Sequence, residues 1–228
     1  MRRRGKRFLA GLKTFSREKR YGLDEAIQVL GGFPKAKFDE TVELSVRLGT
    51  DPGKTDQAVR GSVSLPKGIG KTKKVIVFAN GDVARQATEA GAAEVGAADL
   101  AKKVEEGFVD FDVAIAHPSM MRFVGKLGKV LGPLGKMPSP KSGTVTDNVL
   151  AAVREFRAGK IEFRSDAAGN VQVGLGKRSF AAADLKANVE YFLEHLRGIR
   201  PSSVKGEFIR KATLSSTMSP GVALDVKG

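Results

Sequence analysis

The stretch Lys74-Val-Ile-Val-Phe-Ala-Asn-Gly-Asp82 decides how the middle of the chain folds. Its β-branched and aromatic run predicts a buried strand over 74–79, and the Asn-Gly-Asp sequence after it is typical of a turn leading into a helix. The alternation continues with helices predicted over 83–89, 99–106 and 148–158, and strands predicted over 92–95 and 111–116. Strands separated by helices in this way predict a parallel sheet with helices on both faces.

Both flanks of this block show a different pattern. Apolar and polar residues alternate over 38–48, 59–65, 160–164 and 170–175, which predicts half-buried strands. An amphipathic helix is predicted over 180–196, and two strands over 208–216 and 222–226 flank a bend at 217–221. We therefore predict a mixed α/β and α+β protein of two domains: a discontinuous α+β domain (1–67 plus 160–228) and an inserted α/β domain (68–159).

The composition points to a polyanionic partner. The chain has 228 residues with 39 Lys+Arg and 25 Asp+Glu, a net charge of +14, and residues 1–20 alone hold nine basic residues and one acidic residue. Such a charge balance favours nucleic acid as the partner. The absence of Cys excludes a disulfide framework, a thiolate metal site and a cysteine nucleophile.

The basic N-terminus does not predict export. No apolar stretch of a signal peptide follows it, and no run approaches the ~20 residues that cross a bilayer. We expect a cytoplasmic protein with no membrane partner.

The sequence offers little for catalysis. Gly70-Lys71-Thr72 resembles the end of a phosphate-binding loop, but Leu65 stands where that motif needs its first Gly, so a flexible basic loop is the better interpretation. His117 and His195 lie far apart and lack partner motifs. We expect no catalytic residue, no metal and no cofactor; the alternative is a phosphate-ligand or nucleotide-handling enzyme that uses the Gly/Lys-rich loops at 66–72 and 125–143.

Two short segments suit RNA. Lys35-Ala-Lys37-Phe38 puts two cations and an aromatic ring at a predicted strand start, where they could hold phosphates and pack on a ribose. Ser215-Ser-Thr-Met-Ser-Pro-Gly221 offers hydroxyls, backbone amides and a thioether, which suits the shallow RNA minor groove. An ordinary core Phe and an ordinary turn are the alternative interpretations.

Two further features have two interpretations each. Asp39, Glu40 and Glu43 are either a solvated strand face or acceptors for ribose hydroxyls. The run from Gly125 to Gly143 combines bare backbone with lysines, so it either approaches a phosphate backbone or forms a packed connection over the inserted sheet.

Several of these segments together resemble the bacterial large-subunit ribosomal protein "L-one" family. The resemblance runs over essentially the whole chain, and its most specific motif is Leu127-Gly-Lys-Val-Leu-Gly-Pro-Leu-Gly-Lys-Met-Pro138. The other matching segments are Lys37–Glu43, Gly61–Pro66, Gly159–Arg164 and Thr217-Met218.

The resemblance implies a split RNA-binding domain and an inserted, Rossmann-like, three-layer α/β/α domain. It implies binding to large-subunit rRNA at the mobile stalk, help in releasing deacylated exit-site tRNA, and translational repression through the protein's own operon mRNA. It also implies a place in the large ribosomal subunit and no obligate protein oligomer.

Position by position, the resemblance makes Lys37, Phe38, Thr41, Thr217 and Met218 RNA contacts. Ser219 belongs to the same bend, but the family usually has Gly there, so its side chain could crowd the RNA. Arg164 is a further candidate RNA contact. The weaker candidates for phosphate contact are Arg3, Arg4, Lys6, Arg7, Lys35, Lys136 and Lys141, of which Lys136 stands where the family more often has Leu.

Overall fold

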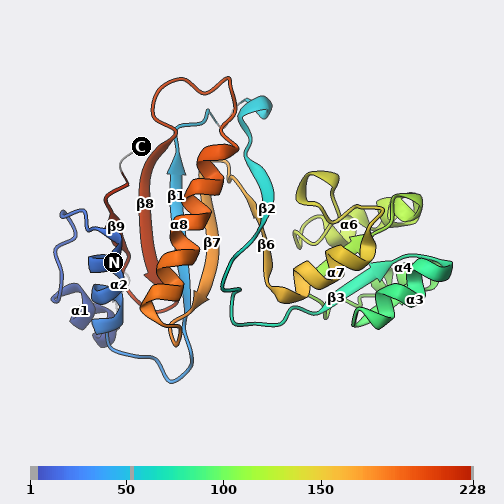
Figure 1. The fold of residues 1–228 in the computed structure, drawn as a ribbon, viewed down its shortest axis with the longest axis horizontal. Coiled ribbons are helices and arrows are strands. Elements are labelled where there is room, and N and C mark those ends of the chain that lie inside the picture. Colours follow the sequence, from blue (N-terminus) through green and yellow to red (C-terminus); the bar gives the residue numbers. More distant parts are fainter. Residues whose placement is uncertain (1–4, 52–53, 227–228) are drawn as a thin grey trace. The chain divides into compact units, whose positions relative to one another are not determined.

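The computed structural model describes residues 5–51 and 54–226. The chain divides into two compact units: the parts up to Gly70 and from Phe163 form the first, and Lys71–Glu162 form the second. The sequence had suggested boundaries after residues 67 and 159. The mixed α/β and α+β class predicted from the sequence is confirmed (Figure 1).

An antiparallel four-stranded sheet forms the centre of the first unit. Its strands are β1 (Thr41–Leu48), β7 (Asn170–Lys177), β8 (Ile209–Ser216) and β9 (Val222–Leu224), in the order β7-β1-β8-β9. The central strand β1 alternates between buried apolar residues such as Val42 and Leu44 and exposed or half-buried polar ones. One face of the sheet therefore packs against the core, and the other face is polar.

Helices cover the apolar face of this sheet. Helix α8 (Ala182–Gly198) lies across β1 and β7 in Figure 1, and α2 (Leu23–Gly32) packs against α8, β8 and β9. Leu185, Val189, Phe192 and Leu196 form the buried stripe of α8. This stripe has the spacing that predicted the helix, although the helix begins two residues later than the predicted range, 180–196, and ends two later.

The remaining elements of the first unit lie at its edges. Helix α1 (Lys6–Leu12) precedes α2, and a 3-10 turn, η1 (Thr55–Gln57), follows β1. Strand β2 (Arg60–Ser64) pairs with β6 (Lys160–Arg164) in a separate sheet, and β6 itself crosses the division between the units after Glu162. Neither α1 nor α2 was predicted from the sequence.

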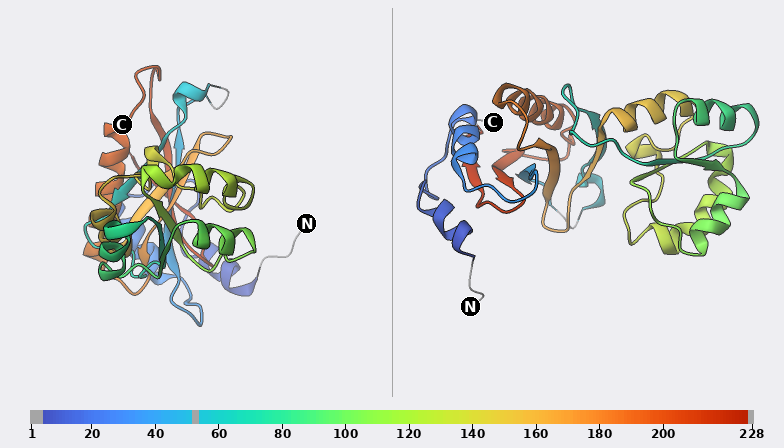
Figure 2. Two further views of the ribbon diagram at one scale, coloured as in Figure 1. Left: turned by 90° about the vertical axis from the view of Figure 1, so that its right-hand side faces the viewer. Right: turned by 90° about the horizontal axis from the view of Figure 1, so that it is seen from below.

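The second unit has three layers, as the Rossmann-like expectation requires. Its parallel sheet has the order β4-β3-β5, formed by β3 (Val75–Phe78), β4 (Glu94–Gly96) and β5 (Val113–Ala116). Helices α3 (Gly81–Glu89) and α7 (Val149–Ala158) pack on one face. The other face is covered by α4 (Ala98–Glu105), α5 (Met121–Val124), η3 (Gly125–Leu127) and α6 (Gly128–Leu131). The right-hand view of Figure 2 shows helices on both sides of the strands of this unit.

Three predictions for this unit need correction. Strand β4 begins two residues later than the predicted 92–95, and β5 two residues later than the predicted 111–116. Helix α4 begins and ends one residue earlier than the predicted 99–106, and the Asp99 carboxylate in its first turn accepts from the Ala97 amide at 2.8 Å. The Gly125–Gly143 run forms the short helices η3, α6 and η4 (Pro140–Ser142), and Leu127 and Leu131 are buried in the core, which favours the packed connection.

Candidate nucleic-acid interface

The start of β1 and the end of β8 bring the two predicted RNA segments together. The Thr217 amide donates to the Thr41 carbonyl at 3.1 Å, and the Thr41 amide donates to the Thr217 hydroxyl at 3.0 Å. Lys177, at the end of β7, donates its ammonium to the Thr41 hydroxyl at 3.0 Å. Residues 176 positions apart in the chain thus share one small surface at the end of the sheet.

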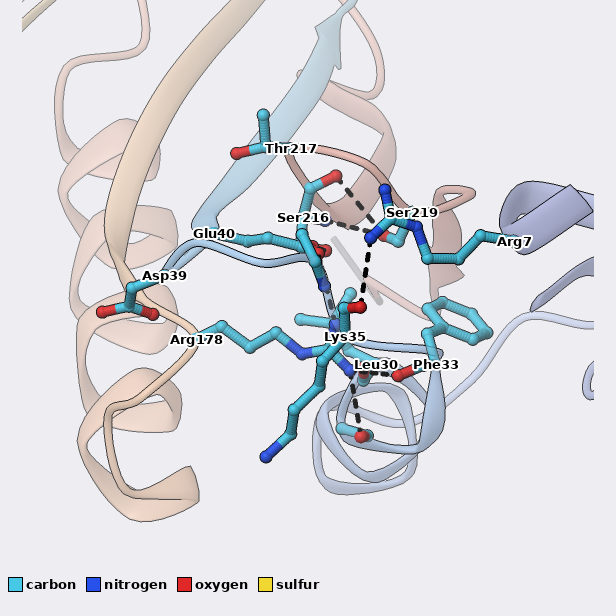
Figure 3. A network of polar contacts seen from close by, with 12 residues as sticks. Arg7, Leu30, Phe33, Lys35, Asp39, Glu40, Arg178, Ser216, Thr217 and Ser219 are labelled. Carbon is cyan, nitrogen blue, oxygen red and sulfur yellow. Dashed lines mark hydrogen bonds and ion pairs between the residues drawn. The ribbon is translucent and has the colours of Figure 1, made fainter. Parts of the chain in front are cut away.

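The bend after β8 is held by its own side chains. The Ser216 amide donates to the Ser219 hydroxyl at 2.8 Å, and the Ser219 amide donates to the Ser216 carbonyl at 3.0 Å. The Ser219 hydroxyl also lies 3.1 Å from the Pro220 carbonyl. The side chain that stands in place of Gly is therefore turned into the bend (Figure 3), where it fixes the loop that presents Thr217 and Met218.

Beneath the surface, one buried carboxylate joins three segments. Glu40 is 1% exposed; its Oε1 accepts from the Ala36 amide at 2.9 Å, and its other oxygen accepts from the Ser216 hydroxyl. The Arg178 guanidinium lies 3.5 Å from Oε1 and completes a buried ion pair (Figure 3). The expectation that Glu40 belongs to a solvated strand face is wrong, because β1 begins only at Thr41 and the preceding turn points Glu40 inward.

Arg178 also holds the end of helix α2. Its Nη2 donates to the carbonyl oxygens of Leu30 at 3.2 Å, Gly31 at 3.1 Å and Phe33. The last carbonyls of a helix have no partner within the helix, so a guanidinium there satisfies them and also favours the negative end of the helix dipole. The segment that follows α2, which carries Lys35, Lys37 and Phe38, therefore starts from a fixed point.

Two large apolar side chains are exposed to solvent at this end of the sheet. Phe38 is 54% exposed and Met218 is 48% exposed, while Lys35 and Lys37 are exposed beside Phe38 in the chain. The alternative that Phe38 is an ordinary core residue is wrong. A cavity of about 270 Å³ opens beside the ring, lined by Lys35, Ala36, Phe38, Asp39, Glu40, Arg178 and Ser179.

Helix α1 is attached to this surface. Arg7 donates to the Lys35 carbonyl at 3.1 Å, and Gly11 is packed so closely that an added Cβ would lie 3.2 Å from Pro220 and 3.3 Å from Phe33. Lys6 is exposed on the same helix. Arg3 and Arg4 lie outside the described residues.

The other predicted phosphate contacts lie elsewhere. Arg164 is exposed at the end of β6, in the two-stranded sheet. Lys136, in the second unit, donates to the carbonyls of Val109 at 3.0 Å and Phe111 at 2.6 Å, so its ammonium is used within the unit. Lys141 is exposed in η4. Arg164 thus comes from the first unit, and Lys136 and Lys141 come from the second.

The groups considered for catalysis have structural surroundings. The His117 ring lies 2.7 Å from the Ser119 hydroxyl and caps the short turn η2 (Pro118–Met120), and His195 packs edge-on against Phe163. Lys71 pairs with Asp112 at 3.0 Å, away from any phosphate-loop geometry. Among the residues that the structure describes, no group of three His, Asp or Glu could hold a metal, and no helix is long and apolar enough to cross a membrane.

Beside that pair, Lys73 sits in a small cavity with Lys136 and Glu162. Burial lowers the pKa of Lys73 below its ordinary value, and its ammonium donates to the Lys160 carbonyl at 2.6 Å. The pKa of Asp112 is lowered despite partial burial, because the Lys74 amide and Lys71 donate to its carboxylate. Neither lysine is presented to a ligand in the manner of a nucleophile.

Sequence reasoning missed the residues that position the surface. Arg178 follows a strand directly and carries no motif, and its role is revealed by its ion pair with Glu40 and its contact with the end of α2. Ser216 was read as part of the hydroxyl-rich bend, yet it is 3% exposed and bonded to Glu40. The alternating pattern over 38–48 puts Glu40 at a position where the other residues are apolar. A carboxylate at such a position was the one available signal in the sequence.

Comparison with known proteins places this chain among relatives of similar length. The model of the ribosomal protein L1p/L10e family matches residues 30–220, so α1 and most of α2 lie outside the match. The chain is 52% identical over 227 residues to large ribosomal subunit protein uL1 of Chlamydia trachomatis (serovar L2b), covering 100% of this chain and 98% of that protein. It is 48% identical over 225 residues to the protein of the same name from Kosmotoga olearia, covering 99% and 97% of the two chains.

Proposed function

The chain belongs to the ribosomal protein L1p/L10e family, and from this premise we propose that the surface around Thr41 and Thr217 binds large-subunit rRNA. The family consists of ribosomal structural proteins and not of enzymes, so the nucleotide-handling alternative is abandoned.

One observation carries the proposal: Phe38 and Met218 are exposed on either side of the Thr41–Thr217 junction, on a protein with a net charge of +14. Exposed apolar side chains cost free energy in water unless a partner covers them. Riboses and bases offer such cover, and Lys35 and Lys37 supply charge for the adjoining phosphates. The exposed Thr217 hydroxyl is a group that can meet a ribose 2′-hydroxyl, while the Thr217 amide is held by the Thr41 carbonyl.

The RNA contacts that we propose are Lys37, Phe38, Thr41, Thr217 and Met218, with Ser219 supporting the bend and Arg164 as a separate contact. Lys35, Lys6, Arg7 and the arginines Arg3 and Arg4 add attraction to phosphates. We assign this role to the domain formed by both chain ends. Lys136 and Lys141 belong to the inserted domain, and Lys141 is the more accessible of the two.

The finer roles follow from the family resemblance. We propose that the bound rRNA is that of the mobile stalk, that the protein assists release of deacylated tRNA from the exit site, and that it represses its own operon by binding the mRNA. Because the mRNA would imitate the rRNA site, both RNAs would compete for the same surface. A ribosome-free copy would then repress, and an assembled copy would not.

A salt-titrated binding assay tests the proposal. The stalk segment of large-subunit rRNA is compared with a scrambled hairpin of equal length and charge. We expect tight binding to the stalk segment that persists at high salt while the scrambled hairpin is released. Equal affinities that fall together with salt would overturn the proposal, because only non-specific attraction would then be present.

The same assay tests the repressor role. Leader RNA from the protein's own operon is added to the preformed complex with the stalk segment. We expect the leader to displace the stalk segment competitively. Formation of a ternary complex would mean that the two RNAs use different surfaces.

A further inference from the structure

Two cations face each other on the open side of the four-stranded sheet. Arg47 in β1 and Lys211 in β8 are directly opposite partners, and both side chains are exposed. On its other side Arg47 is opposite Asn170 of β7, a neutral residue. Thr41 lies on the same face of β1 as Arg47, because residues an even number of positions apart point to the same side of a strand.

This pairing costs the free protein stability. Like charges directly opposite each other in an antiparallel pair are destabilising. Over residues 5–51 and 54–226, neither Arg47 nor Lys211 has an ion-pair partner. Other exposed lysines of the same unit do have one: Lys67 pairs with Asp184 at 3.2 Å and Lys186 with Asp24 at 2.8 Å.

Two neighbouring cations that have no carboxylate partner are suited to bind an external anion. A guanidinium offers a planar fork of donors that matches two phosphate oxygens, and an ammonium beside it adds a second charge. We propose that Arg47 and Lys211 together bind a phosphate of the RNA backbone, as a second contact point at the far end of the sheet from Met218. The inference rests on the proposed RNA-binding function.

The face between the two points suits a close RNA approach. Thr41 and Arg47 are six residues apart, roughly 20 Å along an extended strand. The positions between them carry small hydroxyl side chains, Ser45 in β1 with Thr213 and Ser215 in β8, in directly paired rows. Glu43 is the one carboxylate among them, and it is placed to accept from a ribose 2′-hydroxyl. Phosphate contacts fix the register of a nucleic acid, so this pair would set the direction of the RNA along the strands.

The test uses the full chain with the double substitution Arg47→Gln and Lys211→Gln. We expect affinity for the stalk segment to fall by about tenfold, since charge-assisted hydrogen bonds to one phosphate are lost. The slope of log K against log salt should become shallower by about 1 to 2. The urea midpoint of unfolding should stay the same or rise, because the repulsion between the two cations is removed.

A matched control removes the same charge elsewhere. Arg85→Gln with Lys102→Gln, both exposed in the inserted domain, changes the net charge equally and should leave affinity and slope nearly unchanged. The single variant Lys211→Arg should bind like the unmodified protein, which shows that charge and not packing matters there.

The outcomes separate the two proposals. If the unmodified protein prefers the stalk segment but the double variant binds it with the same affinity and slope, the phosphate site is wrong and the RNA-binding function stands. An equal effect of the control pair would also overturn the site. If the unmodified protein shows no preference for the stalk segment, both proposals fail.

Discussion

Glu40 and Arg178 form a buried ion pair directly beneath the exposed ring of Phe38 and the Thr217 bend, with 3.5 Å between Oε1 and Nη1. Each partner also binds backbone or side-chain groups that the other does not reach: Glu40 holds Ala36 and Ser216, and Arg178 holds the end of α2. The two exposed segments that we propose to bind RNA are thus held in place by two buried side chains. The surface is set before its partner arrives, which lowers the entropy cost of binding.

Breaking this pair should be costly. Glu40→Gln leaves Arg178 as a buried cation without a counter-charge, and removal of one partner of a buried pair costs roughly 3–5 kcal/mol in the free energy of unfolding. Urea unfolding measures the loss. As the control, Asp24→Asn breaks the exposed pair with Lys186 and should cost less than about 1 kcal/mol. Similar losses for the two variants would contradict the role given to Glu40.

Removing surface groups should act on affinity instead. Thr217→Ala and Met218→Ala each remove a group at the junction without changing the charge, so we expect weaker binding of the stalk segment with little change in the salt slope. Binding to the scrambled hairpin should stay the same. The measurement is the ratio of the two affinities at several salt concentrations, alongside the urea midpoint of each variant.

The N-terminal arginines should act in the opposite way. Neutralising Arg2, Arg3 and Arg4 together should make the salt slope shallower by up to about 2–3. The reason is that fewer phosphates are neutralised on binding, so fewer counterions are released from the RNA. Specific preference for the stalk segment should persist. If these variants instead lose the preference while Thr217→Ala keeps it, specificity resides in the arm and not in the bend.

Acid should weaken the turn before β7. The pKa of Asp166 is lowered chiefly by the backbone amide of Asn170, and also by the Asn170 side chain and the Ala168 amide. A lowered pKa in the folded state adds stability above the ordinary Asp value of about 3.9, and this stability is lost as the pH falls below it. Asp166→Asn should therefore reduce the drop in urea midpoint between pH 5 and pH 3. Asp56→Asn, at another exposed carboxylate of the same unit, is the control. An equal reduction of the pH-dependent drop in that variant would contradict the role given to Asp166.

The sequence predicted much of the inserted domain because periodicity decides it. Val75 to Phe78 are all buried, and the helix over 148–158 has its Asn148 cap, with the side chain accepting from the Ala151 amide at 3.2 Å. Local signals of this kind need no distant contact. The same holds for the buried stripe of α8.

The helices near the N-terminus escaped prediction for a physical reason. Helix α2 starts after Gly22 without a side-chain cap, so of the usual start signals it has only the acidic residues Asp24 and Glu25 in its first turn. Its end is held by Arg178, which lies far away in the sequence. Helix α1 likewise depends on the packing of Gly11 against Pro220.

The candidate surface was predicted in part. Alternation over 38–48 put Phe38 on the same strand face as Val42, which would bury it, but the strand begins at Thr41 and Phe38 turns outward. The exposed ring was therefore one of two interpretations of the Lys35–Phe38 segment, and the family resemblance favoured it. Pairings such as Arg47 with Lys211 depend on strand register, which no local pattern supplies.

The strand order of the larger sheet has a consequence for protein synthesis. β1 lies between β7 and β8, and Thr41 in β1 bonds to Thr217, which is translated 176 residues later. The neighbouring strand β7 is translated earlier, at 170–177, so β1 lacks its second neighbour until residues 209–216 have been added. A nascent copy therefore lacks the complete Thr41–Thr217 surface, the proposed RNA site, until the bend at Thr217 has been translated.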